Sequence, residues 1–260
     1  MTATVETLVA PPPVARHRWI EEWEPENPAF WEATGKKVAR RNLLFSVFSE
    51  HIGFSVWTMW SSLVLFLGPK YGFTPADKFL LTSTPALVGS LVRVPYTFAV
   101  ARFGGRNWTV VSALLLLIPL VVTLFVLEPG VSLGTLMLTG ALAGFGGGNF
   151  ASSMTNINAF YPDRLKGRAL GLNAGGGNIG VAAVQLVALA VLATAGKAHP
   201  KTLVGIYIPL VLLAAAMAWL AMDNLAHMQN DKRGMRDVMK DKHTWVMSLL
   251  YIGTFGSFIG

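Results

Sequence analysis

Residues 144–185, GFGGGNFASSMTNINAFYPDRLKGRALGLNAGGGNIGVAAVQ, hold two apolar stretches that are rich in glycine and asparagine and flank a short basic loop. Glycine costs an isolated helix about 1 kcal/mol relative to alanine, but it lets two helices pack closely inside a membrane. Asparagine in hydrocarbon is costly unless it finds a hydrogen-bond partner. The stretch therefore predicts two closely packed membrane helices that surround a polar feature.

The composition of the whole chain indicates an integral membrane protein. Hydrophobic residues make up 53% of the chain and charged residues only 13%, whereas a soluble domain usually has about 25% charged residues. A bilayer core needs about 20 apolar residues per helix. Runs of this length lie at 42–68, 79–100, 108–127, 132–160, 169–195 and 203–222. Because they are continuously apolar rather than alternating, they predict helices and exclude a barrel of strands.

These runs predict an all-α membrane protein with four parts. We expect a cytoplasmic tail and surface segment at 1–41, a six-helix transmembrane bundle at 42–222, a cytoplasmic loop at 223–243 and the start of a seventh helix at 244–260. Six helices, a charged connector and a new helix are typical of transporters built from two six-helix halves. Since the chain ends at Gly260 within an apolar run, we expect it to be truncated and to need a carboxy-terminal half for activity.

The distribution of basic residues predicts the orientation of these helices. The loops on one side hold only Lys70, Lys78, Lys197 and Lys201, whereas lysines and arginines are frequent on the other side, as in residues 36–41 and 164–168. Because cytoplasmic loops carry the excess of these residues, we expect a multi-pass protein of the inner or plasma membrane with a cytoplasmic amino terminus. The net charge of +7 is spread over separate loops, so nucleic-acid binding is not expected.

Arg93 lies near the middle of the second apolar run, about seven residues or roughly 10 Å from its inner end. An arginine at this depth costs several kcal/mol and must face the bundle interior. One interpretation is a structural ion pair. The other is an anion site, because the planar guanidinium donates two parallel hydrogen bonds to a planar oxyanion.

Glu50 and His51 are further ionisable residues inside an apolar run, at a depth similar to that of Arg93. Glu50 could neutralise Arg93 when no anion is bound, or it could carry a proton across the membrane. His51 titrates near neutral pH by itself, although such a residue often only fills a packing role. The sequence leaves both interpretations open.

Polar and small residues recur at helical spacing in the fourth and fifth runs. Asn149, Ser153 and Asn156 share one face of the fourth run, and Gly171, Asn178 and Gln185 share one face of the fifth. With Asn173 and Gly177 they predict close helix packing and a polar path. The alternative is a helix interface that is held by amides alone.

The sequence carries no complete pattern of an enzyme. The glycines of residues 175–180 fit a dinucleotide-binding pattern, but they lie within a membrane run and follow no strand, which that fingerprint requires. We also find no metal-ligand cluster and no nucleophile triad in the sequence. We therefore expect neither an enzyme nor a cofactor.

The stretch GGGNFASSMTNINAFYP at 146–162, followed by KGRALGLNAGGGNIGV at 166–181, resembles the first nitrate signature of the nitrate/nitrite porters (NarK type) of the major facilitator superfamily. RVPYTFAVARFGGRNW at 93–108 is similar to the second helix of that family, and WVMSLLYIGTFGSFIG at 245–260 to its seventh helix. EPENPAFWEATGKKVARRNL at 24–43 resembles its amino-terminal segment. The resemblance extends from about residue 23 to residue 260.

The resemblance implies a bundle of the major facilitator type and a set of substrate residues. It places the substrate arginine at Arg93, the aromatic ring that covers the anion at Phe150, an asparagine of the fifth helix at Asn178 and a tyrosine of the seventh helix at Tyr251. The second arginine and second nitrate signature of the family belong to the carboxy-terminal half.

The implied function is secondary transport of nitrate, nitrite or both across the bilayer by alternating access. The first helix, with SEHIGFSVW at 49–57, is more similar to the proton-symporting branch of the family, which favours symport of nitrate with protons. Nitrate/nitrite exchange is the alternative mode. A membrane anion sensor that does not transport is the alternative of a different class.

Overall fold

The computed structural model describes residues 18–228 and 232–259, and the chain divides into two units, Met1–Met228 and Gln229–Gly260. The first unit contains β1 (Trp19–Ile20), α1 (Pro28–Phe30), a π-helical turn (Trp31–Gly35), α2 (Lys36–Leu63), a 3-10 turn (Pro69–Tyr71), α3 (Pro75–Phe103), α4 (Gly105–Leu115), α5 (Leu117–Val126), α6 (Leu133–Ala143), α7 (Phe145–Phe160), α8 (Asp163–Thr194), α9 (Pro200–Ala221) and β2 (Asn224–Leu225). The second contains α10 (Lys232–Lys240) and α11 (Lys242–Ile259).

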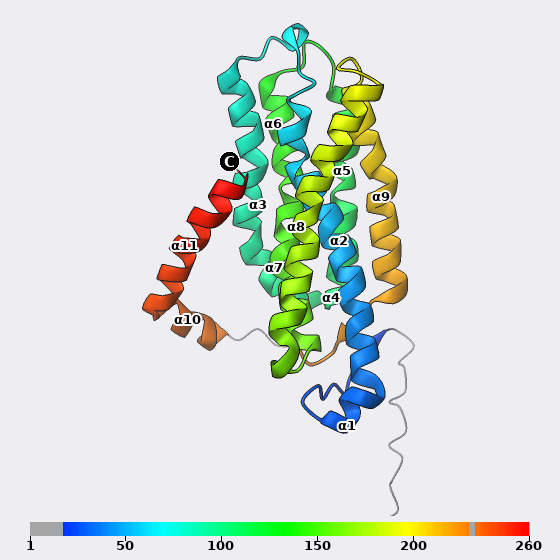
Figure 1. The fold of residues 1–260 in the computed structure, drawn as a ribbon, viewed down its shortest axis with the longest axis vertical. Coiled ribbons are helices and arrows are strands. Elements are labelled where there is room, and N and C mark those ends of the chain that lie inside the picture. Colours follow the sequence, from blue (N-terminus) through cyan, green and yellow to red (C-terminus); the bar gives the residue numbers. More distant parts are fainter. Residues whose placement is uncertain (1–17, 229–231, 260) are drawn as a thin grey trace, which may run out of the picture. The chain divides into compact units, whose positions relative to one another are not determined.

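The long helices of the first unit run side by side and reverse direction at each loop (Figure 1). The loops α2–α3, α5–α6 and α8–α9 gather at one end, and α1 lies at the other. Helix α2 is central, since it packs against α7, α8 and α9, while α3 packs against α6 and α7. Buried apolar residues from α2, α3, α5, α6, α8 and α9 meet in the core, among them Val56, Leu136, Val184 and Val211.

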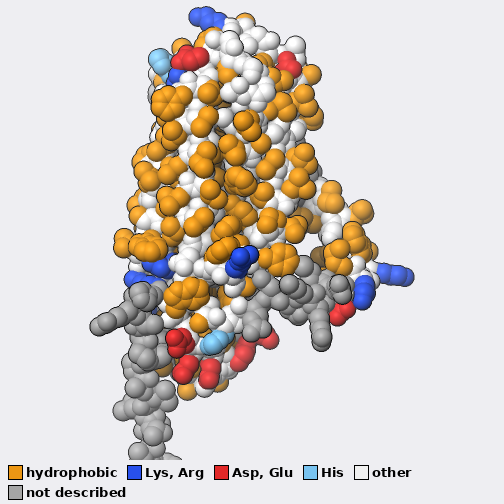
Figure 2. Space-filling model, turned by 180° about the vertical axis from the view of Figure 1, so that it is seen from behind, with side chains coloured by type: hydrophobic (Ala, Val, Ile, Leu, Met, Phe, Trp, Pro, Cys, Tyr) orange, Lys and Arg blue, Asp and Glu red, His pale blue; other side chains and the backbone are white. Residues whose placement is uncertain are grey.

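The surface of this bundle is suited to lipid. Large apolar side chains such as Phe79, Phe125, Leu138 and Leu220 are exposed, and the face shown in Figure 2 is apolar over its middle, with charged side chains towards the ends. In the described residues, four stretches are long and apolar enough to cross a membrane, namely Pro75–Phe103, Gly105–Val126, Asp163–Thr194 and Pro200–Ala221. An apolar surface of this extent marks a membrane-facing surface.

Two predicted runs are divided in the structure. The run at 108–127 forms α4 and α5, which meet at Leu116, because Pro119 has no N–H to donate to the carbonyl of Leu115. The run at 132–160 forms α6 and α7, which meet at Gly144. A Cβ at Gly144 would lie 2.8 Å from Cβ of Val88 on α3, so the missing side chain allows α3 to approach this junction.

The amino-terminal segment of the first unit is fastened to the end of α9. Strands β1 and β2 pair in parallel, with Trp19 opposite Asn224. The buried carboxylate of Asp223 forms ion pairs with Arg18 and Arg41, and it accepts a hydrogen bond from Asn42 Nδ2 at 2.9 Å. This pairing of distant segments was not predicted from the sequence.

Tryptophans of the same segment pack against the ends of the membrane helices. Trp31 is buried in a cluster with Phe160 and Leu225, and the rings of Trp23 and Phe160 meet edge to face at 5.3 Å. Of the predicted tail and surface segment at 1–41, residues 1–17 lie outside the described residues.

Candidate functional site

The guanidinium of Arg93 lies where α3 meets α2 and α7. Its Nε donates a hydrogen bond to the backbone oxygen of Gly147 at 3.3 Å. Its Cζ lies 5.1 Å from the ring centre of Phe150 and 5.6 Å from that of Trp57, which is within the range of a cation–π contact. The structure therefore brings together Arg93 and Phe150, two of the four residues that the resemblance assigned to anion binding.

A glycine allows this arrangement on α7. A Cβ at Gly147 would lie 2.8 Å from the Trp57 ring and 3.0 Å from Cα of Gly89. Both distances are shorter than a normal contact between non-bonded carbon atoms. Because residue 147 has no side chain, its carbonyl can come within reach of Arg93 on the neighbouring helix.

Aromatic residues of α2 support the Phe150 ring. The rings of Phe54 and Phe150 are nearly parallel, at 17° and 6.1 Å between centres, and Phe54 also contacts Trp57 at 5.2 Å. Trp57 Nε1 donates a hydrogen bond to the carbonyl of Pro85 at 2.8 Å, which ties α2 to α3. Sequence reasoning missed Phe54 and Trp57, although they follow Glu50 at i+4 and i+7 and so share its helix face.

Glu50 is buried between α2, α7 and α8, with an exposed fraction of 1%. Its Oε2 accepts hydrogen bonds from the hydroxyl of Ser153 on α7 and from Nδ2 of Asn173 on α8, the latter at 2.6 Å. Asn173 Nδ2 also lies 2.9 Å from Ser153 Oγ. These neutral groups join three helices around one carboxyl, and Arg93 on α3 interacts with it electrostatically.

His51 lies beside Glu50 on α2. Among the described residues, its side chain forms a hydrogen bond only with the backbone of α8. Its Nδ1 is 3.3 Å from the carbonyl oxygen of Gly176. One turn further along α2, Ser55 Oγ lies 2.9 Å from the carbonyl oxygens of both His51 and Gly180 and can donate its hydrogen to either. These contacts hold α2 against α8 and are compatible with the packing role considered for His51.

Two glycines of α8 make the approach to α2 possible. A Cβ at Gly177 would lie 2.6 Å from both Cγ and Cδ of Glu50, and one at Gly180 would overlap the carbonyl of His51. Gly177 and Asn173 are both buried. The packing that small residues allow thus brings α8 directly onto the Glu50 carboxyl.

Asn149 and Asn156 are buried on α7, with exposed fractions of 4% and 1%. A Cβ at Gly53 on α2 would overlap the amide of Asn149, and one at Gly105 at the start of α4 would overlap that of Asn156. Within the described part of the chain, the amide atoms of neither side chain make a hydrogen bond. Their spacing along α7 follows the predicted polar path, but its role stays a prediction.

The other predicted residues are less closely connected to this cluster. Asn178 is half-buried and donates to the carbonyl of Ala174 on its own helix at 2.9 Å. Gly171 and Gln185 are exposed. Tyr251 lies on α11 in the second unit, so its approach to the anion stays a prediction.

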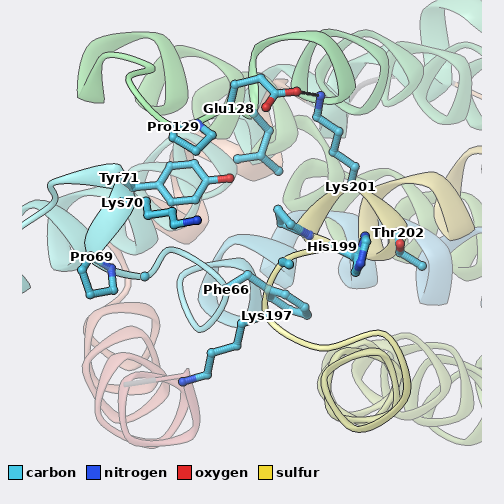
Figure 3. Close-up of a pocket in the computed structure, with 14 residues that line it drawn as sticks. Phe66, Pro69, Lys70, Tyr71, Glu128, Pro129, Lys197, His199, Lys201 and Thr202 are labelled. Atoms are coloured by element: carbon cyan, nitrogen blue, oxygen red, sulfur yellow. Dashed lines mark hydrogen bonds and ion pairs between the residues drawn. The ribbon is translucent and has the colours of Figure 1, made fainter.

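A separate pocket of about 560 Å³ lies among the loops at the end of the bundle opposite α1 (Figure 3). Lys70, Lys197 and Lys201 line it, and Lys201 forms an ion pair with Glu128. Burial and the nearby Glu128 raise the pKa of the Tyr71 phenol above its usual value. Arg93 and Glu50 do not line this pocket, whose basic side chains can raise the local concentration of anions.

No group of three or more His, Cys, Asp or Glu side chains that could hold a metal ion occurs among the residues that the structure describes. The site offers the planar guanidinium of Arg93, which lies against aromatic rings. The neighbouring helix α2 contributes the buried carboxyl of Glu50. This arrangement can bind a small planar anion and can hold or release a proton.

Comparison with known proteins identifies the family of the chain. Residues 43–260 match the model of the Major Facilitator Superfamily. The nitrate/nitrite transporter NarU of Salmonella typhimurium is 42% identical over 258 residues, which is 93% of this chain and 56% of the relative. The NarU of Escherichia coli is 41% identical over the same shares. A probable nitrate/nitrite antiporter NarK2 of Thermus thermophilus is 37% identical over 95% of this chain and 59% of the relative.

The chain thus spans just over half the length of these curated relatives. The family confirms the predicted fold class, an all-α multi-pass membrane protein, and the prediction that the chain belongs to a family of transporters rather than of enzymes. Over most of its length the chain is similar to nitrate/nitrite porters of the NarK type. The chain belongs to the major facilitator superfamily.

Proposed function

We propose that this chain supplies the amino-terminal half of a secondary transporter that moves nitrate and nitrite across the cytoplasmic membrane by alternating access, with nitrate entering together with protons. In this proposal six helices of residues 42–222 cross the membrane, the amino terminus is cytoplasmic, and residues 223–243 link the bundle to a seventh helix. Its basis is the Arg93 guanidinium, which lies against the rings of Phe150 and Trp57.

The chemistry of Arg93 fits nitrate. The bond from Nε to the carbonyl of Gly147 holds the plane of the guanidinium, whose terminal nitrogens carry N–H donors in a fork that matches a planar oxyanion. The adjacent ring of Phe150 offers a flat apolar surface to the plane of the anion. We propose that Asn178 and Tyr251 donate further hydrogen bonds to it.

The coupling to protons rests on the position of Glu50. Nitrate entry against an inside-negative potential of 100 mV costs about 2.3 kcal/mol. One proton per nitrate removes that cost, and a second one makes the potential favourable. When nitrate neutralises Arg93, the nearby Glu50 loses the attraction of that cation, so nitrate binding and proton binding favour each other.

Exchange of nitrate for nitrite is the second candidate mode. The observation in its favour is the Thermus thermophilus relative, which is 37% identical and is described as a probable nitrate/nitrite antiporter. In that mode Glu50 would balance the charge of Arg93, and the counter-moving anion would supply the driving force.

Arg93→Lys in the full-length protein tests the anion site. The lysine keeps the charge but loses the planar fork, and a hydrogen bond to a charged group is worth about 1.5–3 kcal/mol. We expect nitrate affinity to fall roughly 10- to 150-fold. Arg102→Lys is the matched control, because Arg102 is exposed on the same helix and also lies beside a ring, that of Phe103 at 5.4 Å. Equal affinities for the two variants would refute the assignment.

Glu50→Gln distinguishes the two modes of coupling. In proteoliposomes that hold the full-length protein, we expect nitrate uptake driven by a pH gradient to be lost and exchange of nitrate for nitrite to persist. Glu32→Gln, which changes an exposed carboxylate paired with Lys36, is the control. Normal internal acidification during nitrate uptake by Glu50→Gln would exclude Glu50 as the proton carrier.

A further inference from the structure

The hydroxyl of Ser153 lies within hydrogen-bond distance of two acceptors. One is Oε2 of Glu50, and the other is the backbone oxygen of Phe150, at 3.0 Å. A serine hydroxyl has a single hydrogen and two lone pairs, so it can donate to only one of these acceptors at a time. Asn173 Nδ2 lies 2.9 Å from the same hydroxyl and supplies it with a hydrogen bond in either state.

We propose that Ser153 is a proton-controlled switch between the Glu50 carboxyl and the turn of α7 that carries Phe150. When Glu50 is ionised, the Ser153 hydroxyl donates to Oε2. When a proton binds Oε2, the carboxyl becomes the donor to Ser153 Oγ, and the serine hydrogen turns to the carbonyl of Phe150. The bound proton forms one O–H bond on Oε2 and no other covalent bond changes. The hydrogen bond between Ser153 and Glu50 reverses its direction, and a hydrogen bond from Ser153 to the carbonyl of Phe150 is added.

The switch reaches the anion site through the backbone of α7. A serine that bonds to a carbonyl of its own preceding turn changes the local geometry of the helix. Here that turn holds the Phe150 ring at 5.1 Å from Arg93 and parallel to Phe54. Protonation of Glu50 is thereby communicated to the ring that covers the anion. Ser153 acts as a positioning residue, since it touches neither nitrate nor Arg93 in this scheme.

The ionisable groups around Glu50 allow this assignment. Beside it on α2 is His51, whose Nδ1 contacts the carbonyl of Gly176, and α3 contributes Arg93, the charged group that acts on Glu50. The nearest groups of α7 and α8 are the neutral Ser153 and Asn173. The ionisable groups of the other packed elements are engaged elsewhere, namely Tyr207 of α9 near Ser55, Arg106 of α4 on Trp219 and Glu32 of the π-helical turn with Lys36.

The test is the pH dependence of nitrate affinity, measured on the full-length protein at a mildly acidic and a mildly alkaline pH. The inference rests on the proposed function, in which nitrate affinity rises as pH falls. For Ser153→Ala we expect the ratio of the two affinities to fall about tenfold, which corresponds to about 1.4 kcal/mol of lost coupling. Ser153→Thr keeps the hydroxyl and should keep the ratio. Ser152→Ala is the matched control, because Ser152 is also buried on α7 and, among the described residues, its hydroxyl bonds only within its own helix, to the carbonyl of Asn149 at 3.2 Å.

The outcomes separate the switch from the proposed function. If the parent is pH-dependent, Glu50→Gln is not, and Ser153→Ala behaves like the parent, the switch is refuted and proton coupling through Glu50 stands. If neither the parent nor Glu50→Gln shows pH dependence, proton coupling fails and the switch fails with it.

A spectroscopic measurement keeps the test independent of affinity. The band of the protonated Glu50 carboxyl, identified in infrared difference spectra by its loss in Glu50→Gln, should shift in Ser153→Ala, which cannot accept its hydrogen bond. If Ser153→Ala does not fold, Ser153→Cys, with a weaker hydrogen-bonding group, should shift the same band and weaken the pH dependence. An unshifted band refutes the switch.

Discussion

Replacement of Gly177 by alanine tests the contact between α8 and the Glu50 carboxyl. The added Cβ would lie 2.6 Å from Cγ and Cδ of Glu50, which must move by about 1 Å to reach van der Waals distance. The carboxyl is held by Ser153 and Asn173 and cannot swing aside freely. Overpacking of this kind costs about 1–3 kcal/mol, against a gain in helix propensity of about 1 kcal/mol for alanine.

Gly175→Ala is the matched control on the same helix. No atom lies within 4 Å of the Cβ position at Gly175 in the described structure, so only the gain in helix propensity remains. The two variants should differ by about 1–3 kcal/mol in the free energy of unfolding. At roughly 2–4 °C per kcal/mol for a domain of this size, Gly177→Ala should unfold about 2–12 °C below Gly175→Ala.

The assay is thermal unfolding of both variants in the same detergent, followed by tryptophan fluorescence. Nitrate affinity is measured in parallel, because displacement of Glu50 should also change its pH dependence. If Gly177→Ala unfolds at the same temperature as Gly175→Ala, α8 does not approach Glu50 as closely as the structure indicates. The arrangement of Ser153 and Asn173 around the Glu50 carboxyl would then be incorrect.

Three further predictions follow from other parts of the chain. Asn178→Ala and Tyr251→Phe each remove one proposed donor, worth about 1–3 kcal/mol, and should weaken nitrate binding roughly 5- to 150-fold; parent-like affinity of both variants would show that these donors are wrongly assigned. Asp223→Asn removes the charge that pairs with Arg41 and should expose the amino-terminal segment to limited proteolysis at a concentration of protease that spares the parent. Lys197→Glu should slow nitrate uptake at low ionic strength only, since added salt screens surface charge; a rate that does not respond to salt would exclude steering by the pocket.

The site residues differ in how far the sequence alone could identify them. Arg93 is visible as an isolated charge in an apolar run. A charge at that depth is costly, so its presence indicates a functional site. Phe150 has no such signal, since a phenylalanine in a membrane helix is unremarkable, and only the resemblance to a known family singled it out. Phe54 and Trp57 were missed for the same reason.

The membrane class, the helical runs and the family could be predicted from the order of residues along the chain. These follow from continuous apolar stretches and from a local signature, which are properties of neighbouring residues along the chain. Helical spacing also indicates which residues share a face, as for Asn149, Ser153 and Asn156 on α7.

Which helix faces meet became apparent only in the folded chain. Spacing by seven grouped Gly171 with Gln185, yet both are exposed, whereas Asn173 of the same helix is buried against Glu50. Likewise, Asp223 forms an ion pair with Arg41, although most of the chain lies between them in sequence. The physical reason is that the period of a helix sets the relative direction of its side chains, while the approach of a second helix depends on the shapes of both surfaces. The contact of Ser153 with Glu50 arises from that fit between helices distant in sequence.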